Sequence, residues 1–159
     1  MQQAIRHILS ESGISFSIET YEYNPQGSSI GVQAAQSMGQ DENSVAKTLI
    51  IEVDKKQPVC VVLPVHKKVN MDNVASLLMG KKARMMNADK STKLTGFVSG
   101  GTSPLGVFNL MPVYVAKELM NLKALYVNAG DRGLVVKLAP QDLIQLTGAK
   151  AAAVSLELA

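Results

Sequence analysis

Residues 46–63 read AKTLIIEV, then DKKQP, then VCVVL. The first and third runs are rich in β-branched and aliphatic residues, which is typical of buried strands. The middle run, Asp54 to Pro58, is charged and contains a proline, so it predicts a hairpin between the two strands. Lys47 interrupts the apolar pattern near the start of the first strand. A lysine in such a run either extends its ammonium group to solvent or serves a binding site.

Helices and strands are predicted along the rest of the chain from periodicity and from capping residues. The expected helices cover residues 4–9, 28–38, 74–78, 88–94 and 140–146. The further strands are expected at residues 14–20, 83–86, 112–116, 124–127, 133–138 and 152–156. In the first of these strands, Ile14, Phe16 and Ile18 alternate with polar residues, which predicts one buried face. No repeat or linker is visible, so we predict one α+β domain over residues 1–159, with a mixed, mainly antiparallel sheet flanked by short helices.

Composition excludes several classes of protein. The chain has 159 residues and 47% hydrophobic residues, enough for a folded core and not typical of a disordered protein. Its longest apolar runs are too short to cross a bilayer, and the N-terminal residues lack the apolar region of a secretory signal. The single cysteine, Cys60, cannot form a disulfide within the chain. We therefore expect a cytoplasmic protein.

The positive charge of the chain is small but unevenly distributed. The formal net charge is +3, and short basic clusters occur at Lys55-Lys56, Lys67-Lys68 and Lys81-Lys82, the last followed by Arg84. These clusters are either solvated strand ends or contacts for an acidic partner. The chain has no Trp and only seven Phe and Tyr residues, so a stacking platform for single-stranded nucleic acid is poorly supported.

A glycine-rich loop, Gly100-Gly101-Thr102-Ser103-Pro104-Leu105-Gly106, is the second unusual feature. Glycine permits close approach to the main chain, and exposed N–H groups can bind an ester or phosphate oxygen. The loop is neither a Walker phosphate loop nor a Gly-x-Ser-x-Gly nucleophile elbow. By itself the loop fits a structural turn as well as a binding site.

Metal and cysteine chemistry have little support. His7, His66 and Cys60 do not have the spacing of a zinc site, so we expect no bound metal. Cys60 lies within Val59-Cys60-Val61-Val62, which predicts a small core residue instead of a nucleophile.

Four motifs in this order resemble the YbaK family of freestanding aminoacyl-tRNA deacylases. They are Tyr21-Glu22, Val45-Ala46-Lys47-Thr48-Leu49, the loop from Gly100 to Gly106, and Arg132-Gly133-Leu134. The same family is similar to the editing domain inserted in bacterial prolyl-tRNA synthetases. The resemblance extends over essentially the whole chain.

The resemblance implies trans-editing, the removal of a wrong amino acid from charged tRNA, chiefly cysteine from tRNA(Pro). It implies the aminoacyl-tRNA 3′ end as substrate, prolyl-tRNA synthetase as a partner, and no cofactor. Lys47 corresponds to the family's catalytic lysine, and Lys47-Thr48 resembles the cysteine-specific branch, whereas the alanine-specific branch typically has Lys-Asn. The implied substrate-binding residues are Tyr21, Thr48, Gly100, Gly101, Thr102, Ser103, Pro104, Gly106 and Asn128.

The chain departs from the family pattern at two places. It has Asn128-Ala129-Gly130-Asp131 where Ser-Gly-Gly is usual, and Val135 where an acidic residue often follows Arg-Gly-Leu. Both changes are expected at the edge of the pocket, where they bear on the choice of amino acid.

The expected mechanism places the ester between Lys47 and the glycine loop. Main-chain N–H groups from Gly100 to Ser103 would polarise the carbonyl, and Lys47 would stabilise the developing oxyanion. The resemblance implies that the thiol of a cysteinyl substrate attacks the carbonyl of its own ester. An alanyl substrate has no thiol, so its ester would have to be attacked by an activated water. The alternatives are a deacylase for another small amino acid, or a non-catalytic module that binds a nucleotide or small ligand.

Overall fold

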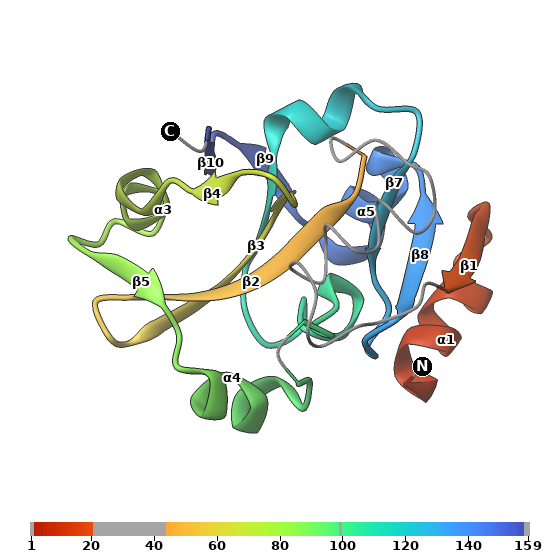
Figure 1. Cartoon of the computed structure of the whole chain (residues 1–159), viewed down its shortest axis with the longest axis horizontal. Helices are drawn as coiled ribbons and strands as arrows, with labels where there is room; N and C mark the ends of the chain where they lie inside the picture. The colour runs from red at the N-terminus through yellow and green to blue at the C-terminus, as the bar shows by residue number, and fades with distance from the viewer. Residues whose placement is uncertain (1, 21–43, 99, 158–159) are drawn as a thin grey trace.

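A long antiparallel hairpin runs through the middle of the protein (Figure 1). In this computed structural model, which describes residues 2–20, 44–98 and 100–157, the hairpin joins β2 (Ala46–Val53) to β3 (Gln57–Pro64). From Val59 onward every residue of β3 is buried, as expected for a strand covered on both faces. The hairpin predicted from residues 46–63 is therefore confirmed.

The described residues form two larger sheets and one small strand pair. The five-stranded sheet has the order β5-β2-β3-β6-β9, in which β3, β6 and β9 run parallel and the other pairs are antiparallel. The three-stranded sheet β1-β8-β7 and the pair β10-β4 are antiparallel. The strands not yet located are β1 (Phe16–Thr20), β4 (Lys68–Val69), β5 (Ala83–Met85), β6 (Val113–Ala116), β7 (Leu125–Asn128), β8 (Leu134–Leu138), β9 (Lys150–Ala152) and β10 (Ser155–Leu156).

The two larger sheets meet at the start of β2. Val45 forms an isolated parallel bridge with Tyr126, and the Tyr126 N–H donates to the Ser44 carbonyl at 2.9 Å. Continuing this register by two residues brings Lys47 of β2 to the level of Asn128 at the end of β7. The bridge thus connects the hairpin that carries Lys47 to the sheet that carries Asn128.

Short helices cover the sheets, as Figure 1 shows. The α-helices are α1 (Gln3–Glu11), α3 (Met71–Leu77), α4 (Ala88–Thr95) and α5 (Pro140–Thr147), and the 3₁₀ helices are η1 (Pro104–Gly106) and η2 (Lys117–Asn121). The side chains of Asn70 and Asn87 accept main-chain N–H groups at the starts of α3 and α4. Gly96 and Gly148 end α4 and α5 in the left-handed conformation. The helix predicted at 28–38 lies outside the described residues.

The α+β prediction with a mixed, mainly antiparallel sheet is confirmed, but two local predictions are wrong. Phe16 and Ile18 are 37% and 40% exposed, because β1 is the edge strand of its sheet and no described element covers that face. The strand predicted at 152–156 is two short strands, since the chain leaves the edge of one sheet at β9 and pairs with β4 at β10. Within the described ranges, none of the helices has the length and hydropathy needed to cross a bilayer.

Candidate functional site

The candidate site is built around an unpaired part of one edge of β2. β7 lies beside this edge at Val45, and β5 pairs with it from Ile51 onward. Between these two contacts, at Thr48, no described strand pairs with the edge. Because successive side chains of a strand point to opposite faces, Lys47 and Thr48 lie on different sides of this opening.

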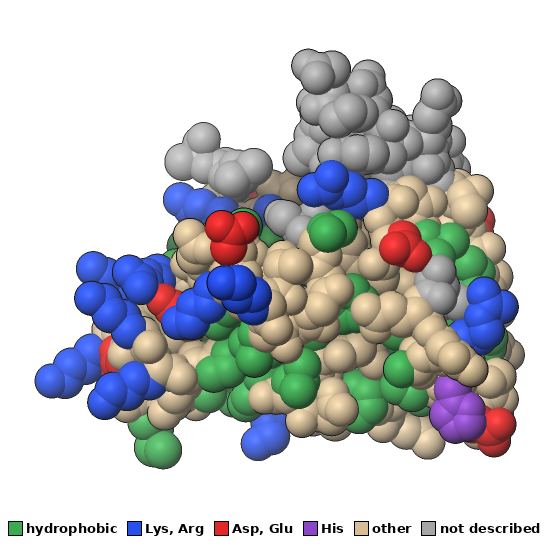
Figure 2. Space-filling view, turned by 90° about the horizontal axis from the view of Figure 1, so that it is seen from below, with side chains coloured by type: hydrophobic (Ala, Val, Ile, Leu, Met, Phe, Trp, Pro, Cys, Tyr) green, Lys and Arg blue, Asp and Glu red, His purple; other side chains and the backbone are tan. Residues whose placement is uncertain are grey.

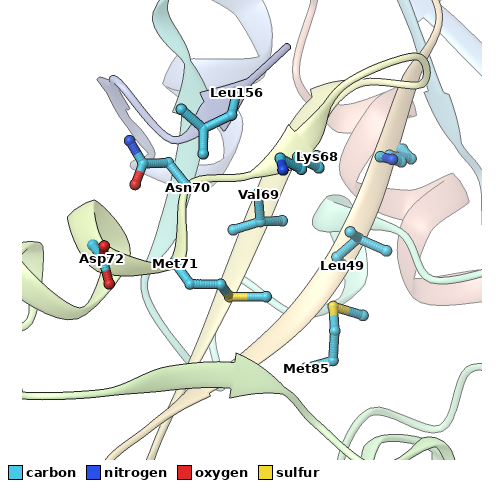
Figure 3. A pocket seen from close by; sticks show the side chains of 9 residues that line it. Leu49, Lys68, Val69, Asn70, Met71, Asp72, Met85 and Leu156 are labelled. Carbon is cyan, nitrogen blue, oxygen red and sulfur yellow. The ribbon is translucent and has the colours of Figure 1, made fainter. Parts of the chain in front are cut away.

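Lys47 lines the larger of two cavities beside the opening, of about 500 Å³. Figure 3 shows Leu49, Val69, Met71 and Met85 converging to form an apolar wall. Polar side chains complete the lining: Lys47, Lys68, Asn70 and Asp72. The cavity thus combines an apolar wall with two cationic groups from different strands, β2 and β4.

Lys47 is half-buried, and no described residue forms an ion pair with its ammonium group. Burial lowers the pKa of the Lys47 amine from its ordinary value, since desolvation disfavours the charged form. A cation without a carboxylate partner at the wall of a cavity is available to stabilise negative charge on a ligand.

Thr48 lines a smaller cavity of about 150 Å³ together with two members of the glycine loop, Gly100 and Thr102. The Thr48 side chain is buried, and its Oγ1 has no hydrogen-bond partner among the described residues. An unsatisfied buried hydroxyl is costly, so a ligand in this cavity would gain by forming a hydrogen bond with Thr48.

The two cavities adjoin each other. Leu49 and Met85 line both of them, so they are in contact around the open edge of β2. The glycine loop and Lys47 therefore approach the same opening from different sides and do not line one common cavity. A ligand that contacts both must pass over the edge of β2 at Thr48.

Other residues of the glycine loop hold its shape. The Ser103 Oγ accepts the Leu105 N–H at 3.2 Å and caps η1, and both Ser103 and Pro104 are buried. A Cβ on Gly106 would lie 2.4 Å from the Cζ of Phe97, so this glycine is required by packing. Ser103, Pro104 and Gly106 were all predicted to bind substrate, and these contacts show that they also stabilise the conformation of the loop.

Gly101 also faces protein rather than an open cavity. A Cβ there would lie 3.2 Å from the Gly130 carbonyl oxygen and 3.4 Å from that of Val98. The glycine loop thus packs, main chain to main chain, against the turn that follows β7. The side of Gly101 on which a Cβ would lie therefore faces this turn.

Asn128 and Val135 lie opposite each other in the β7–β8 pair. Asn128 is half-buried at the end of β7, whereas Val135 is buried in the sheet. Neither lines the two cavities, so the departure at Val135 changes the sheet interior and not the cavity wall. Tyr21, also predicted to bind substrate, lies outside the described residues.

Sequence reasoning missed several residues of the larger cavity. These are Lys68, Asn70, Met71, Asp72, Met85 and Leu156. Lys68 was visible only as one half of a basic pair, and Asn70 carries the ordinary signal of a helix cap. Their common location depends on the pairing of β4 with β10 and of β5 with β2, which no local pattern encodes.

Comparisons with known proteins bear on the family of the chain and on its fold. Residues 24–146 match the model of the aminoacyl-tRNA editing domain family. The chain is 31% identical over 121 residues to a candidate Cys-tRNA(Pro)/Cys-tRNA(Cys) deacylase of Enterococcus faecalis (strain ATCC 700802 / V583), EbsC, covering 76% of this chain and 74% of that protein.

Solved structures share the fold. The hypothetical protein APE2540 aligns with a TM-score of 0.86 at 24% identity, covering 97% of this chain and 100% of that one. A candidate trans-editing enzyme for prolyl-tRNA synthetase aligns with a TM-score of 0.82 at 20% identity, covering 98% and 99%. The family match and the relative confirm the predicted resemblance and enzyme class: the chain belongs to the aminoacyl-tRNA editing domain family and is an aminoacyl-tRNA deacylase.

Proposed function

We propose that the chain is a trans-editing deacylase that removes cysteine from tRNA(Pro), and also from tRNA(Cys). The name of the relative EbsC and the Lys47-Thr48 pair support cysteine as the amino acid. Prolyl-tRNA synthetase is proposed as the partner that delivers the mischarged tRNA. The observation that carries the proposal is the pair of groups at the open edge of β2: an ammonium without a carboxylate partner and a buried hydroxyl without a hydrogen bond.

In this proposal the substrate lies across the edge of β2. The cysteinyl group occupies the smaller cavity, whose volume of about 150 Å³ suits a small side chain. The terminal nucleotide occupies the larger cavity, where Lys47 and Lys68 provide positive charge for its ribose and phosphate oxygens. The ester between the two parts then crosses the edge close to Thr48.

The reaction begins with the thiol of the substrate. Its sulfur forms a bond to the carbonyl carbon of its own ester, and the bond from that carbon to the ribose oxygen breaks. The ribose oxygen leaves with a proton, and water later opens the cyclic thioester to release free cysteine. Lys47 stabilises the oxyanion formed during the attack, a contribution for which removal of one such donor typically costs about 2.7–4 kcal/mol.

The nucleophile in this scheme is not supplied by the protein. Cys60 is the only cysteine of the chain, and it is fully buried in β3. Burial raises the pKa of the Cys60 thiol, so that its reactive thiolate is suppressed. Positioning and charge stabilisation are then the main contributions of the enzyme.

The direct test is a deacylation panel with the purified protein. Cys-tRNA(Pro), Cys-tRNA(Cys) and Ala-tRNA(Pro) are compared, with Lys47→Ala as the inactive control. We expect both cysteinyl substrates to be cleaved, and alanyl-tRNA to be cleaved far more slowly. Faster cleavage of Ala-tRNA(Pro) would assign the chain to another small amino acid, and no cleavage of any substrate would favour a non-catalytic binding module.

A further inference from the structure

Lysine and arginine side chains gather around the tip of the β2–β3 hairpin. Figure 2 shows them crowded at the left side of the molecule, the side on which Figure 1 places the hairpin tip and β5. We call these residues the hairpin-tip patch: Lys55, Lys56, Lys81, Lys82, Arg84, Lys90 and Lys93. The same segments contain only three carboxylates, Glu52, Asp54 and Asp89, so the patch is far more basic than the chain as a whole.

Pairing of β2 with β5 brings the two halves of the patch together. Val53 pairs with Ala83, and the Asp54 N–H donates to the Lys82 carbonyl at 2.8 Å. The Asp54 carboxylate accepts the main-chain N–H groups of Lys81 and Lys82 at 3.0 and 2.9 Å. These bonds fix the hairpin tip against the start of β5.

The nearby carboxylates do not neutralise the exposed lysines. Glu52 is buried and forms ion pairs with Arg84 and Lys90 at 2.6 and 2.7 Å. Asp54 is occupied by main-chain N–H groups. Among the described residues the remaining cations of the patch therefore have no carboxylate partner: Lys55, Lys56, Lys81, Lys82 and Lys93.

The patch also contains a hollow of about 300 Å³. Its lining is Asp54, Lys55, Lys82 and Arg84. A protein–protein interface normally has an apolar or aromatic centre, which this lining lacks. The hollow also has no aromatic ring on which successive bases could stack. A concave site with mostly cationic side chains fits the phosphate groups of a nucleic-acid backbone.

The patch surrounds the far end of β2, the strand that carries the candidate site. Lys47 and the tip at Val53 are six residues apart on β2, which corresponds to about 20 Å along a strand. We propose that the hairpin-tip patch binds the phosphate backbone of the acceptor stem while the 3′ end of the same tRNA occupies the site at Lys47 and Thr48. This assignment rests on the proposed function.

The test compares two triple variants with the same change in charge. Lys56→Gln/Lys81→Gln/Lys82→Gln removes unpaired cations of the patch and leaves the ion pairs of Glu52 intact. Lys117→Gln/Lys123→Gln/Lys150→Gln is the control, because these lysines are exposed and Lys150 lies on β9, at the opposite edge of the five-stranded sheet. Fluorescence anisotropy measures the Kd for an uncharged tRNA(Pro) transcript and for its acceptor-stem minihelix over a range of KCl concentrations.

We expect the patch variant to bind both RNAs about tenfold more weakly, with a slope of log K against log[KCl] smaller by about 2, since each lost phosphate contact removes about 0.7–0.9. Its kcat/KM for Cys-tRNA(Pro) should fall while kcat at saturation is retained.

Equal Kd values and slopes for the two triple variants would overturn the proposal. So would a patch variant that binds RNA normally but fails to bind prolyl-tRNA synthetase. The anisotropy result is independent of catalysis, so a wild-type protein that cleaves no aminoacyl-tRNA would refute the proposed function separately.

Discussion

Lys47 and Thr48 are consecutive in β2, but their side chains line different cavities, which meet around the open edge of the strand. This alternation gives a bound ester an ammonium group on one side and a hydroxyl on the other. A larger ligand can occupy both cavities only by crossing the main chain at this point. Lys47, the proposed catalytic residue, and the glycine loop can therefore contact one substrate without lining one cavity.

Replacing Thr48 with valine should lower kcat/KM without destabilising the fold. The Thr48 Oγ1 has no partner among the described residues, so its removal costs the folded protein no internal hydrogen bond. Thr147→Val is the matched control, because the Thr147 hydroxyl donates to the Leu143 carbonyl at 2.7 Å. We expect this control to lose stability, by about 0.5–1.5 kcal/mol, and to keep its activity per folded molecule. Thermal melting and single-turnover deacylation of both variants make the comparison, and a Thr48→Val protein with normal kcat/KM would remove the hydroxyl from the site.

Lys47→Met should be at least as stable as the wild type at neutral pH, yet lose about 10²–10³ in kcat, the typical effect of deleting one oxyanion donor. Burial lowers the pKa of the Lys47 amine, so carrying the charge costs folding free energy. This cost is fully present below the folded-state pKa and is relieved as the pH rises through it. Deacylation and denaturant unfolding across the alkaline range test both effects. A variant that is both less stable and fully active would contradict the assignment of Lys47.

The central hairpin and the positions of Lys47 and Thr48 could be predicted because the necessary information is local. β-branched runs specify the strands, and asparagine caps and terminal glycines specify the limits of α4 and α5. The glycine loop was recognised as unusual for the same reason. The residues of the loop have different positions: Gly100 and Thr102 line a cavity, whereas Ser103 caps a 3₁₀ helix. Residue types alone could not predict this difference.

The rest of the site depends on contacts between distant segments. Lys68 and Leu156 reach the larger cavity through the pairing of β4 with β10. No strand was predicted at β4, and the strand predicted at 152–156 did not indicate which segment β10 would pair with. The exposed face of β1 was mispredicted because alternation shows that a strand has an apolar side, but not whether another element covers it. The hairpin-tip patch likewise exists only because β5 lies beside β2.

Gly106→Ala should destabilise the protein by about 1–3 kcal/mol, the usual cost of overpacking a core. The new Cβ would lie 2.4 Å from the Phe97 ring, which is buried and cannot move to solvent. Gly101→Ala should have a smaller effect, since its Cβ would lie 3.2 Å from the Gly130 carbonyl oxygen. Urea unfolding of both variants measures the difference. Unchanged stability of Gly106→Ala would show that the loop does not pack on Phe97 as described.

Glu52→Gln should lower the melting temperature at pH 7, and this difference should shrink in acid. Hydrogen bonds from Lys90 and then Arg84 hold the pKa of the Glu52 carboxyl below its ordinary value. A lowered carboxyl pKa contributes stability above the unfolded-state pKa, and that contribution is lost as the pH falls through the folded-state value. Melting curves from pH 7 downward should thus converge for the two proteins. The control is Glu157→Gln, because the Glu157 side chain is exposed and its ion pair with Lys67 should contribute little at any pH. Parallel curves for wild type and Glu52→Gln would contradict this account.

The most direct test of the central claim compares Cys-tRNA(Pro) with Ser-tRNA(Pro) in single-turnover deacylation. The two substrates differ by one atom, and a thiol is appreciably ionised near neutral pH whereas a hydroxyl is not. If the thiol of the substrate attacks its own ester, the cysteinyl substrate is cleaved far faster, and its cyclic thioester, or the cysteine formed from it, is the product. Equal rates for the two substrates would contradict attack by the substrate thiol and would show that the enzyme uses a positioned water instead.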